Sequence, residues 1–305
     1  MNKTLVIGST VIDVLLKVPV LPGRGEDINI TSSEYRVGGC AYNVYRALKL
    51  FRSPAILCSP VGTGIYGRLV RERLSEEGVL PIASPDIENG CCYCLIEEDG
   101  ERSFLSHHGA EYLFSRSWMD GVDFSDAGSV FICGIELEDS CGEEIAGFVC
   151  ERPELALYVA PGPRITHIPA GIMEKLFSRR DQAGKGPFLH LNEKEALGFT
   201  GKSSIEEAAV NLAGRTENSV VITLGERGCY CLGDAGEKGA YIRGFPALVE
   251  DTVGTGDAHY GALIASLKEG KSLEEACRIA NRIGAAVAGI RGSVLDELPD
   301  FPPIE

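Results

Sequence analysis

Short apolar runs alternate with amphipathic stretches along most of this chain. Six of the runs are typical of buried strands: Thr4–Gly8, Ala55–Ser59, Val130–Cys133, Leu155–Ala160, Phe188–Leu191 and Ser219–Leu224. Between them, apolar residues recur at helical spacing in Ala41–Phe51, Gly67–Glu77, Gly142–Glu151, Gly171–Ser178 and Ser204–Arg215. Continuously apolar strands separated by helices indicate a mainly parallel sheet with helices on both faces. The pattern therefore predicts a three-layer α/β fold.

Two regions interrupt this alternation. Residues 14–37 carry several prolines and glycines and then a β-like stretch, and residues 91–107 resemble a hairpin with an Asp99-Gly100 turn. Such strands do not easily join a parallel sheet in chain order, so we expect a small β-sheet lid formed by about 14–37 and 91–107. Edge strands of the main sheet are an equally good interpretation. Without repeats or a low-complexity linker, we expect one domain over residues 1–305.

The composition and net charge limit the classes of molecule that this protein is expected to bind. The chain has 305 residues and a formal net charge of −15, from 44 acidic and 29 basic residues. Such a surface repels phosphate backbones and anionic lipids, so we expect neither nucleic acid nor a membrane as a partner. No apolar run approaches the ~20 residues of a membrane span, and Met1 is followed almost directly by a strand, with no room for a signal core. Eleven cysteines, an odd number, suit a reducing compartment, which predicts a cytoplasmic protein.

The cysteines cluster twice, in Cys91-Cys92-Tyr93-Cys94 and in Cys229-Tyr230-Cys231. Neither cluster has the spacing of a zinc site, and both lie in β-like segments where cysteine acts as a small apolar residue. We therefore expect no metal there, and the sequence assigns no further role to Cys91, Cys92 and Cys94.

The strongest chemical signal is the segment Asp251-Thr252-Val253-Gly254-Thr255-Gly256-Asp257, which opens a helix. Its glycines leave backbone N–H groups unshielded where the helix begins, and a helix N-terminus with free N–H groups binds anions. A carboxylate at Asp257 would oppose a bound phosphate unless it accepts a proton from an attacking hydroxyl. The alternative is a helix that is simply capped by Asp257.

This segment resembles the hallmark of the ribokinase (PfkB) family of carbohydrate and nucleoside kinases, Asp-Thr-x-Gly-Ala-Gly-Asp. Thr255 stands where that family usually has alanine. The resemblance implies a ribokinase-like fold, ATP as phosphate donor and a sugar or nucleoside as acceptor. It also implies an anion hole at Gly254, Thr255 and Gly256, with Asp257 as the catalytic base.

The resemblance continues on the substrate side. The run Gly38-Gly39-Cys40-Ala41-Tyr42-Asn43 is similar to the family's Gly-Gly-x-x-x-Asn signature. Paired glycines allow a ligand close to the backbone, and the amide of Asn43 both donates and accepts. Asp13 matches the family's acidic sugar ligand. Gly38, Gly39, Asn43 and Asp13 are thus the expected substrate-binding residues.

On the nucleotide side, Asn192 and Glu195 match the family's Asn-x-x-Glu motif, which places Mg²⁺ and the phosphates through water. From the residues alone the same pair is a helix capping box, and both interpretations are compatible. The family's nucleotide-contacting turn, Thr-x-Gly-x-x-Gly, is matched by residues 223–228, with candidate residues Thr223, Gly225, Arg227 and Gly228. Arg227 either contacts a phosphate or faces solvent.

Three weaker matches complete this side. Asn281 occupies a position where the family commonly has an adenine-side residue. Asp251 and the turn Arg291-Gly292-Ser293 resemble the family's loop for a monovalent cation such as K⁺. His259 falls where the family often has Phe, and packing within the helix is its simplest interpretation. Members of the family commonly dimerise through the lid, which makes a homodimer an open expectation here.

The sequence was also compared with two general nucleotide-binding motifs, the dinucleotide fingerprint and the P-loop, and neither fits. Residues 62–67 satisfy Gly-x-Gly-x-x-Gly, the dinucleotide fingerprint, but follow a second or later strand and lack the acidic residue expected at the end of the next strand. We therefore expect Val61–Gly67 to be a substrate-side loop. No Gly-x-x-x-x-Gly-Lys-Ser/Thr is present, which excludes a P-loop kinase. The rival function is a catalytically silent sugar- or nucleotide-binding regulatory protein of the same fold. The acceptor itself is not encoded in any of these motifs.

Overall fold

The computed structural model describes residues 2–98, 101–138, 141–233 and 238–299. Within these ranges, eight strands form a central sheet in the order β12-β11-β10-β9-β8-β7-β1-β4. The six strands β10, β9, β8, β7, β1 and β4 run parallel, and β11 and β12 add an antiparallel edge. The strands are β1 (Lys3–Ile7), β4 (Ala55–Cys58), β7 (Ala127–Cys133), β8 (Ala156–Ala160), β9 (Phe188–Asn192), β10 (Val220–Thr223), β11 (Gly228–Leu232) and β12 (Ala240–Arg243).

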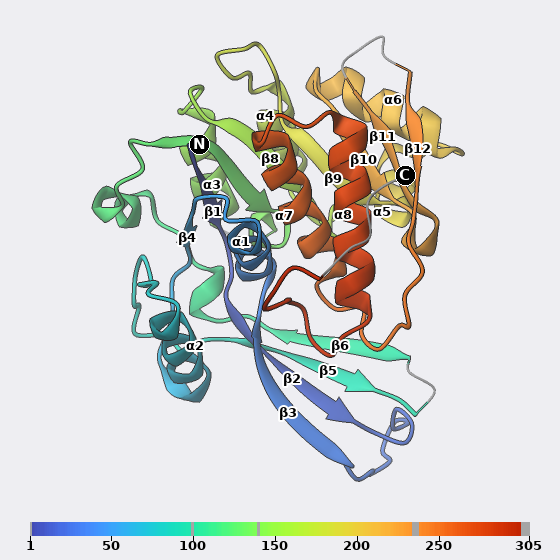
Figure 1. Cartoon of the computed structure of the whole chain (residues 1–305). Helices are drawn as coiled ribbons and strands as arrows, with labels where there is room; N and C mark the ends of the chain where they lie inside the picture. The colour runs from blue at the N-terminus through green and yellow to red at the C-terminus, as the bar shows by residue number, and fades with distance from the viewer. Residues whose placement is uncertain (1, 99–100, 139–140, 234–237, 300–305) are drawn as a thin grey trace.

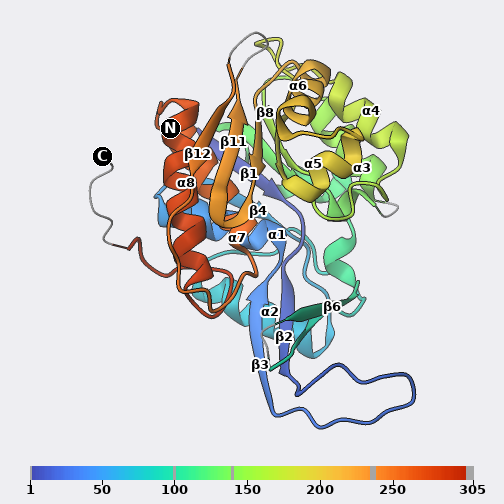
Figure 2. The same ribbon diagram turned by 90° about the vertical axis from the view of Figure 1, so that its right-hand side faces the viewer.

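Helices cover both faces of this sheet, as Figure 1 and Figure 2 show. One face carries α1 (Cys40–Leu50), α7 (Thr255–Lys268) and α8 (Leu273–Ala288), and the other carries α3 (Gly142–Cys150), α4 (Ala170–Ser178), α5 (Glu193–Thr200) and α6 (Ile205–Thr216). Within β1, Leu5 and Ile7 pack into the core beneath α3 to α6, whereas Val6 packs into the core beneath α1 and α7. Burial on both faces explains the continuously apolar strands.

A second sheet, of four strands within the described ranges, lies below the first in Figure 1. Its order is β3-β2-β5-β6, and its strands are β2 (Val11–Lys17), β3 (Ser32–Gly38), β5 (Cys91–Ile96) and β6 (Arg102–His107). Helix α2 (Gly64–Glu76) packs against it, and the hydroxyls of Tyr66 and Tyr93 lie 3.3 Å apart across that contact. This is the lid expected from the two irregular regions, separate from the main sheet.

The expected architecture is confirmed, with two differences of detail. Strand β12 was not anticipated, because Ala240–Arg243 is a short edge strand with alternating exposure and no continuous apolar run. Strand β2 begins at Val11, before the expected start of the lid at residue 14. The Asp99-Gly100 turn lies outside the described residues. No helix in the described part of the chain is long and apolar enough to cross a lipid bilayer.

Candidate active site

Helix α7 begins at a glycine turn that no other residue would fit. Gly254 is the N-cap and has the left-handed φ of 74°, and a Cβ atom on it would lie 2.3 Å from Cβ of Ser293. A Cβ atom on Gly256 would meet nothing within 4 Å, so this position faces open space. The chain therefore turns sharply into α7 and leaves the second residue of the helix uncovered.

The backbone N–H groups at this turn are largely unused. In the part of the chain that the structure describes, the N–H groups of Gly254, Gly256 and Asp257 donate to no protein acceptor, and that of Thr255 makes only a 3.4 Å contact with the Thr252 carbonyl. Free N–H groups and the positive end of the helix dipole together form an anion site. The predicted anion hole thus has the donors it requires.

Asp257 does not cap this helix. It lies in the first turn, and its Oδ2 accepts a 2.9 Å hydrogen bond from Nδ2 of Asn43 in α1. Burial raises the pKa of Asp257 from 3.8 to about 7, the Asn43 hydrogen bond opposes this rise, and the nearby Glu136 charge adds to it. A carboxyl group with a pKa near neutrality is well suited to accept a proton at physiological pH.

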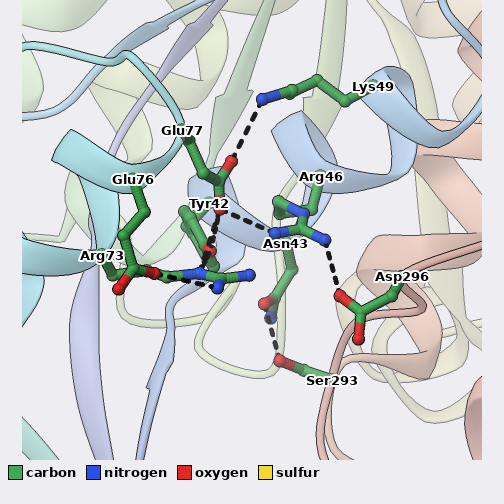
Figure 3. Close-up of polar contacts among 9 residues, drawn as sticks. All are labelled: Tyr42, Asn43, Arg46, Lys49, Arg73, Glu76, Glu77, Ser293 and Asp296. Carbon is green, nitrogen blue, oxygen red and sulfur yellow. Dashed lines mark hydrogen bonds and ion pairs between the residues drawn. The ribbon is translucent and has the colours of Figure 1, made fainter.

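The orientation of Asn43 is set from the C-terminal part of the chain. Its Oδ1 accepts a 2.8 Å hydrogen bond from the hydroxyl of Ser293, which turns Nδ2 toward Asp257. Figure 3 shows this contact beside a second one, in which Arg46 of α1 bridges Glu77 at 2.7 Å and Asp296 at 3.1 Å. These contacts hold α1 in place at the end where Asn43 meets the base.

Asp13, on β2 of the small sheet, lies opposite two glycines that make room for it. A Cβ atom on Gly38 would lie 2.1 Å from Asp13 Oδ2, and one on Gly39 would lie 2.7 Å from the Ser9 carbonyl. Burial raises the pKa of Asp13 to about 7, with the charges of Asp257 and Asp251 adding to the rise. The glycine pair therefore shapes the carboxylate pocket, and the structure brings Asp13 and Asp257 within electrostatic reach of each other.

Glu136 is a buried acid at this site that the motifs did not indicate. It follows β7 in a short 3-10 turn and is 2% exposed, and its Oε1 accepts a 2.8 Å hydrogen bond from the Ser9 backbone N–H. Among the described residues, its Oε2 has no hydrogen-bond partner. Burial raises its pKa. Its place at the carboxyl end of a predicted parallel strand is the signal that could have found it.

Asn192 and Glu195 form the predicted capping box at the start of α5. Asn192 Oδ1 accepts from the Glu195 N–H at 2.8 Å, Glu195 Oε2 accepts from the Asn192 N–H at 3.0 Å, and the Asn192 amide donates to Glu195 Oε1 at 2.6 Å. Burial raises the pKa of Glu195, whose charge in turn contributes to the raised pKa of Asp257. The motif therefore lies at the carboxyl end of β9, within electrostatic reach of Asp257.

The turn after β10 is built by two glycines with positive φ. Gly225 has φ 62° and Gly228 has φ 96°. A Cβ atom on Gly228 would lie only 2.1 Å from the Ile242 carbonyl, so no side chain fits there. Thr223 ends β10, with its hydroxyl 3.4 Å from the Leu191 carbonyl. Arg227 forms an ion pair with Glu193 in the first turn of α5. Its guanidinium thus links the two candidate nucleotide segments.

Asn281 lies inside the fold, 6% exposed. Its amide donates to the carbonyls of Ile242 and Arg243, both at 3.1 Å, and its Oδ1 contacts Nε2 of His259 at 3.0 Å. His259 Nδ1 in turn lies 2.9 Å from Nε2 of the buried His190. This polar chain ties α7, α8, β9 and β12 together, which gives His259 and Asn281 a packing role behind the site.

Asp251 is 3% exposed and has protein partners on both oxygens. Oδ1 accepts from the Val253 N–H at 2.8 Å and pairs with the guanidinium of Arg102, and Oδ2 accepts from the Gly292 N–H at 3.1 Å. A monovalent cation beside this carboxylate would meet the positive charge of Arg102. The residues therefore do not fit the K⁺ site that the sequence resemblance implied.

A cavity of about 740 Å³ separates the small sheet from the loop before α7. Leu15 and Arg36 line it from the small sheet, and Thr252 lines it from the loop. Arg36 is the cross-strand partner of Asp13, and Thr252 lies two residues before Gly254. The cavity is thus near Asp13 and Gly254, although neither residue lines it.

The remaining motif, Gly62–Gly67, is explained by the fold itself. Cβ atoms on its first and last glycines would lie 2.2 Å from the Ile87 carbonyl and 1.9 Å from the Gly62 carbonyl. The motif follows β4, an edge strand, so its position is not that of a dinucleotide site. Cys91, Cys92 and Cys94 lie in β5 as free thiols.

Known proteins are similar to this chain along most of its length. The model of the pfkB carbohydrate kinase family matches residues 1–149 and 183–300. The uncharacterized sugar kinase YegV of Escherichia coli K12 is 30% identical over 296 residues, which cover 95% of this chain and 90% of that protein. Ribokinase of Arabidopsis thaliana is 26% identical over 314 residues, covering 98% of this chain and 78% of that protein.

Solved structures show the same fold. The structure of Arabidopsis thaliana ribokinase complexed with ribose and ATP has a TM-score of 0.78 at 24% identity, covering 95% of this chain and 94% of that one. The structure of ribokinase from Giardia lamblia has a TM-score of 0.82 at 20% identity, covering 96% of this chain and 95% of that one. Both likenesses identify the fold as ribokinase-like.

Proposed function

The chain belongs to the pfkB family of carbohydrate kinases, and from this premise we propose that it transfers the terminal phosphate of ATP to a hydroxyl of a sugar or nucleoside, with Asp257 as general base. The proposal depends on one observation. The carboxyl of Asp257 does not cap α7, and it lies beside the N–H groups of Gly254 and Gly256, which donate to no acceptor in the described part of the chain. One feature takes a proton and the other holds an anion, and phosphoryl transfer to an alcohol requires both.

Asp257 and the start of α7 have complementary roles in this mechanism. The ionised carboxylate accepts the proton of the attacking hydroxyl, while Asn43 holds the carboxylate by its Oδ2 at 2.9 Å. The N–H groups of Gly254, Thr255 and Gly256 point at the position of the transferred phosphoryl group and offset the negative charge that spreads over its oxygens. No rearrangement of the backbone is required for this, because the left-handed turn at Gly254 already exposes the donors.

The acceptor lies between the small sheet and the start of α1. Asp13 accepts hydrogen bonds from substrate hydroxyls, Gly38 and Gly39 keep the space in front of it free of side chains, and the Asn43 amide orients the base. The two neighbouring carboxyl groups suit a polyol, since vicinal hydroxyls donate to carboxylate oxygens. Relatives and structural neighbours include ribokinases and a Burkholderia thailandensis nucleoside kinase in complex with inosine, which supports sugars and nucleosides as the first acceptors to test.

The nucleotide lies over the carboxyl ends of β9 and β10. Thr223, Gly225, Arg227 and Gly228 form the turn that receives it, and Asn281 supports the far side from within the fold. Asn192 and Glu195 would hold Mg²⁺ through water, because an amide oxygen and a carboxylate suit a hard cation that keeps several of its waters. When bound, Mg²⁺ neutralises phosphate charge.

A coupled assay that detects ADP tests this function directly. Wild-type protein with Mg-ATP is screened against a panel of pentoses, hexoses, ketoses and nucleosides, and at least one acceptor is expected to give turnover. Asp257→Asn is expected to lose at least 100-fold in kcat, the usual contribution of a general base, while ATP binding measured by calorimetry stays within threefold. Asp120→Asn, an exposed acid, is the matched control. Turnover retained by Asp257→Asn would refute the base, and binding without turnover by the wild type across the panel would favour the silent regulatory protein.

A further inference from the structure

The segment that leads into the anion hole is held by a charged contact with the small sheet. Asp251 lies three residues before Gly254, and its carboxylate is 5% exposed. A carboxylate taken out of water needs a positive partner or several hydrogen bonds. Here it has both, from the Val253 and Gly292 N–H groups and from the guanidinium of Arg102.

The backbone around Asp251 is fixed on its other side by α8. The N–H groups of Glu250 and Asp251 both donate to the Ala288 carbonyl, at 2.8 and 3.2 Å. From this anchor the chain needs only two more residues to reach the left-handed turn at Gly254. A shift of the Asp251 carboxylate therefore changes the direction in which the N–H groups of the anion hole point.

Arg102 comes from β6, which runs beside the loops that enter α7 and leave α8 in Figure 1. Its side chain is 13% exposed, and its Nη2 also donates to the Glu250 carbonyl at 3.0 Å. The guanidinium thus links the small sheet to the loop between β12 and α7, and it binds both the charge and the backbone of the segment before the anion hole. Asp251 is the residue that the sequence resemblance connected with a monovalent cation, and the positive charge there is supplied by the chain itself.

We propose that Arg102 is a positioning residue whose guanidinium serves as the built-in cation of the anion hole, so that the protein needs no bound monovalent cation. The proposal rests on the proposed function for its catalytic consequence, but the contact itself does not depend on that function. It predicts that wild-type behaviour is independent of K⁺ and that removal of the guanidinium creates a dependence on an added cation.

Thermal melting tests the contact without any turnover. Samples are compared in KCl and in tetramethylammonium chloride at equal ionic strength. The wild type is expected to melt within 1 °C in the two salts, whereas Arg102→Gln melts roughly 5–10 °C lower in tetramethylammonium, as expected when one partner of a buried pair is removed. K⁺ or millimolar guanidinium is expected to restore part of this loss with a saturable dose response. The double variant Arg102→Gln/Asp251→Asn, which lacks the carboxylate as well, is expected to show no such response.

Steady-state kinetics tests the positioning role. With the best acceptor of the panel, Arg102→Gln is expected to lose at least tenfold in kcat/KM for ATP in tetramethylammonium and to recover with K⁺ or guanidinium. Arg116→Gln, which removes a different arginine–carboxylate pair at 2.6 Å from Glu151, is the matched control and is expected to show no rescue. Arg102→Lys, which keeps the charge, is expected to fall between wild type and Arg102→Gln.

Each outcome decides the proposal. A wild type that gains stability or activity with K⁺ relative to tetramethylammonium would overturn it, as would an Arg102→Gln variant that responds to neither cation. If no acceptor gives turnover with any variant, the proposed function fails, while the melting data still accept or reject the built-in cation.

Discussion

The half-buried carboxyl of Asp257 is expected to make the protein less stable at neutral pH than it would be with a neutral side chain. Substitution of Asp257 by Asn keeps the shape and the contact with Asn43, whose Nδ2 then donates to an amide oxygen instead of a carboxylate. The substitution removes the charge and replaces one acceptor oxygen by an NH2 donor. Its effect on stability therefore measures how strongly the fold disfavours the ionised base.

The magnitude follows from the pKa of this group, which burial raises from 3.8 to about 7. Below pH 3.8 the carboxyl is protonated in the folded and unfolded states alike, so the charge has no effect on stability. As pH rises to about 7, only the unfolded state ionises freely, and the folded wild type loses stability until both states are ionised. A difference of about 3 pH units corresponds to roughly 4 kcal/mol at most, and relaxation around the charge leaves about 2–4 kcal/mol.

Urea unfolding at pH 4 and pH 8 measures this difference. The free energy of unfolding of Asp257→Asn is expected to be close to that of the wild type at pH 4 and to exceed it by about 2–4 kcal/mol at pH 8. Asp120→Asn, which neutralises an exposed acid, is expected to follow the wild type at both pH values. A difference between Asp257→Asn and the wild type that does not change with pH would show that Asp257 is not held in a desolvated position.

Three further outcomes are expected. The wild-type kcat/KM rises with pH and levels off above about pH 7, because only ionised Asp257 accepts a proton. Glu136→Gln shifts this rise to lower pH, because the charge of Glu136 raises the pKa of Asp257. A pH–rate profile of Glu136→Gln that coincides with that of the wild type contradicts this. Gly38→Ala raises KM for the acceptor at least tenfold, with KM for ATP unchanged in steady-state kinetics, because its Cβ would lie 2.1 Å from Asp13 Oδ2. Gly254→Ala loses at least about 1 kcal/mol in urea unfolding and binds ATP more weakly by calorimetry, since its φ is 74°; wild-type stability would exclude the strained turn.

The periodicity of the sequence was sufficient for the main sheet because its parallel strands are buried on both faces and therefore continuously apolar. Leu5, Val6 and Ile7 belong to two different cores, yet all are apolar. Strand β12 gives no such signal, because only one of its four residues is buried. The lid was foreseen from its prolines, glycines and hairpin pattern, and dimerisation through it stays a prediction.

The candidate site was only partly accessible from the sequence. Gly254 and Asp257 are three positions apart in the sequence. Their arrangement at the start of α7 is therefore local, and a motif can predict it. Asn43 and Asp257 are separated by 214 positions. Only the packing of α1 on α7 brings the Asn43 amide to the Asp257 carboxylate. The contact between Arg102 and Asp251 spans 149 positions. No spacing rule predicts such a pair.

The hydrogen bond between Ser293 and Asn43 joins residues 250 positions apart. During synthesis, α1 and its asparagine leave the ribosome long before the serine that orients them, and α7 with the base follows only near the end. A nascent chain can thus fold its first strands early while its catalytic centre stays unassembled. The contact that orients Asn43 therefore forms only after the C-terminal part of the chain has been made.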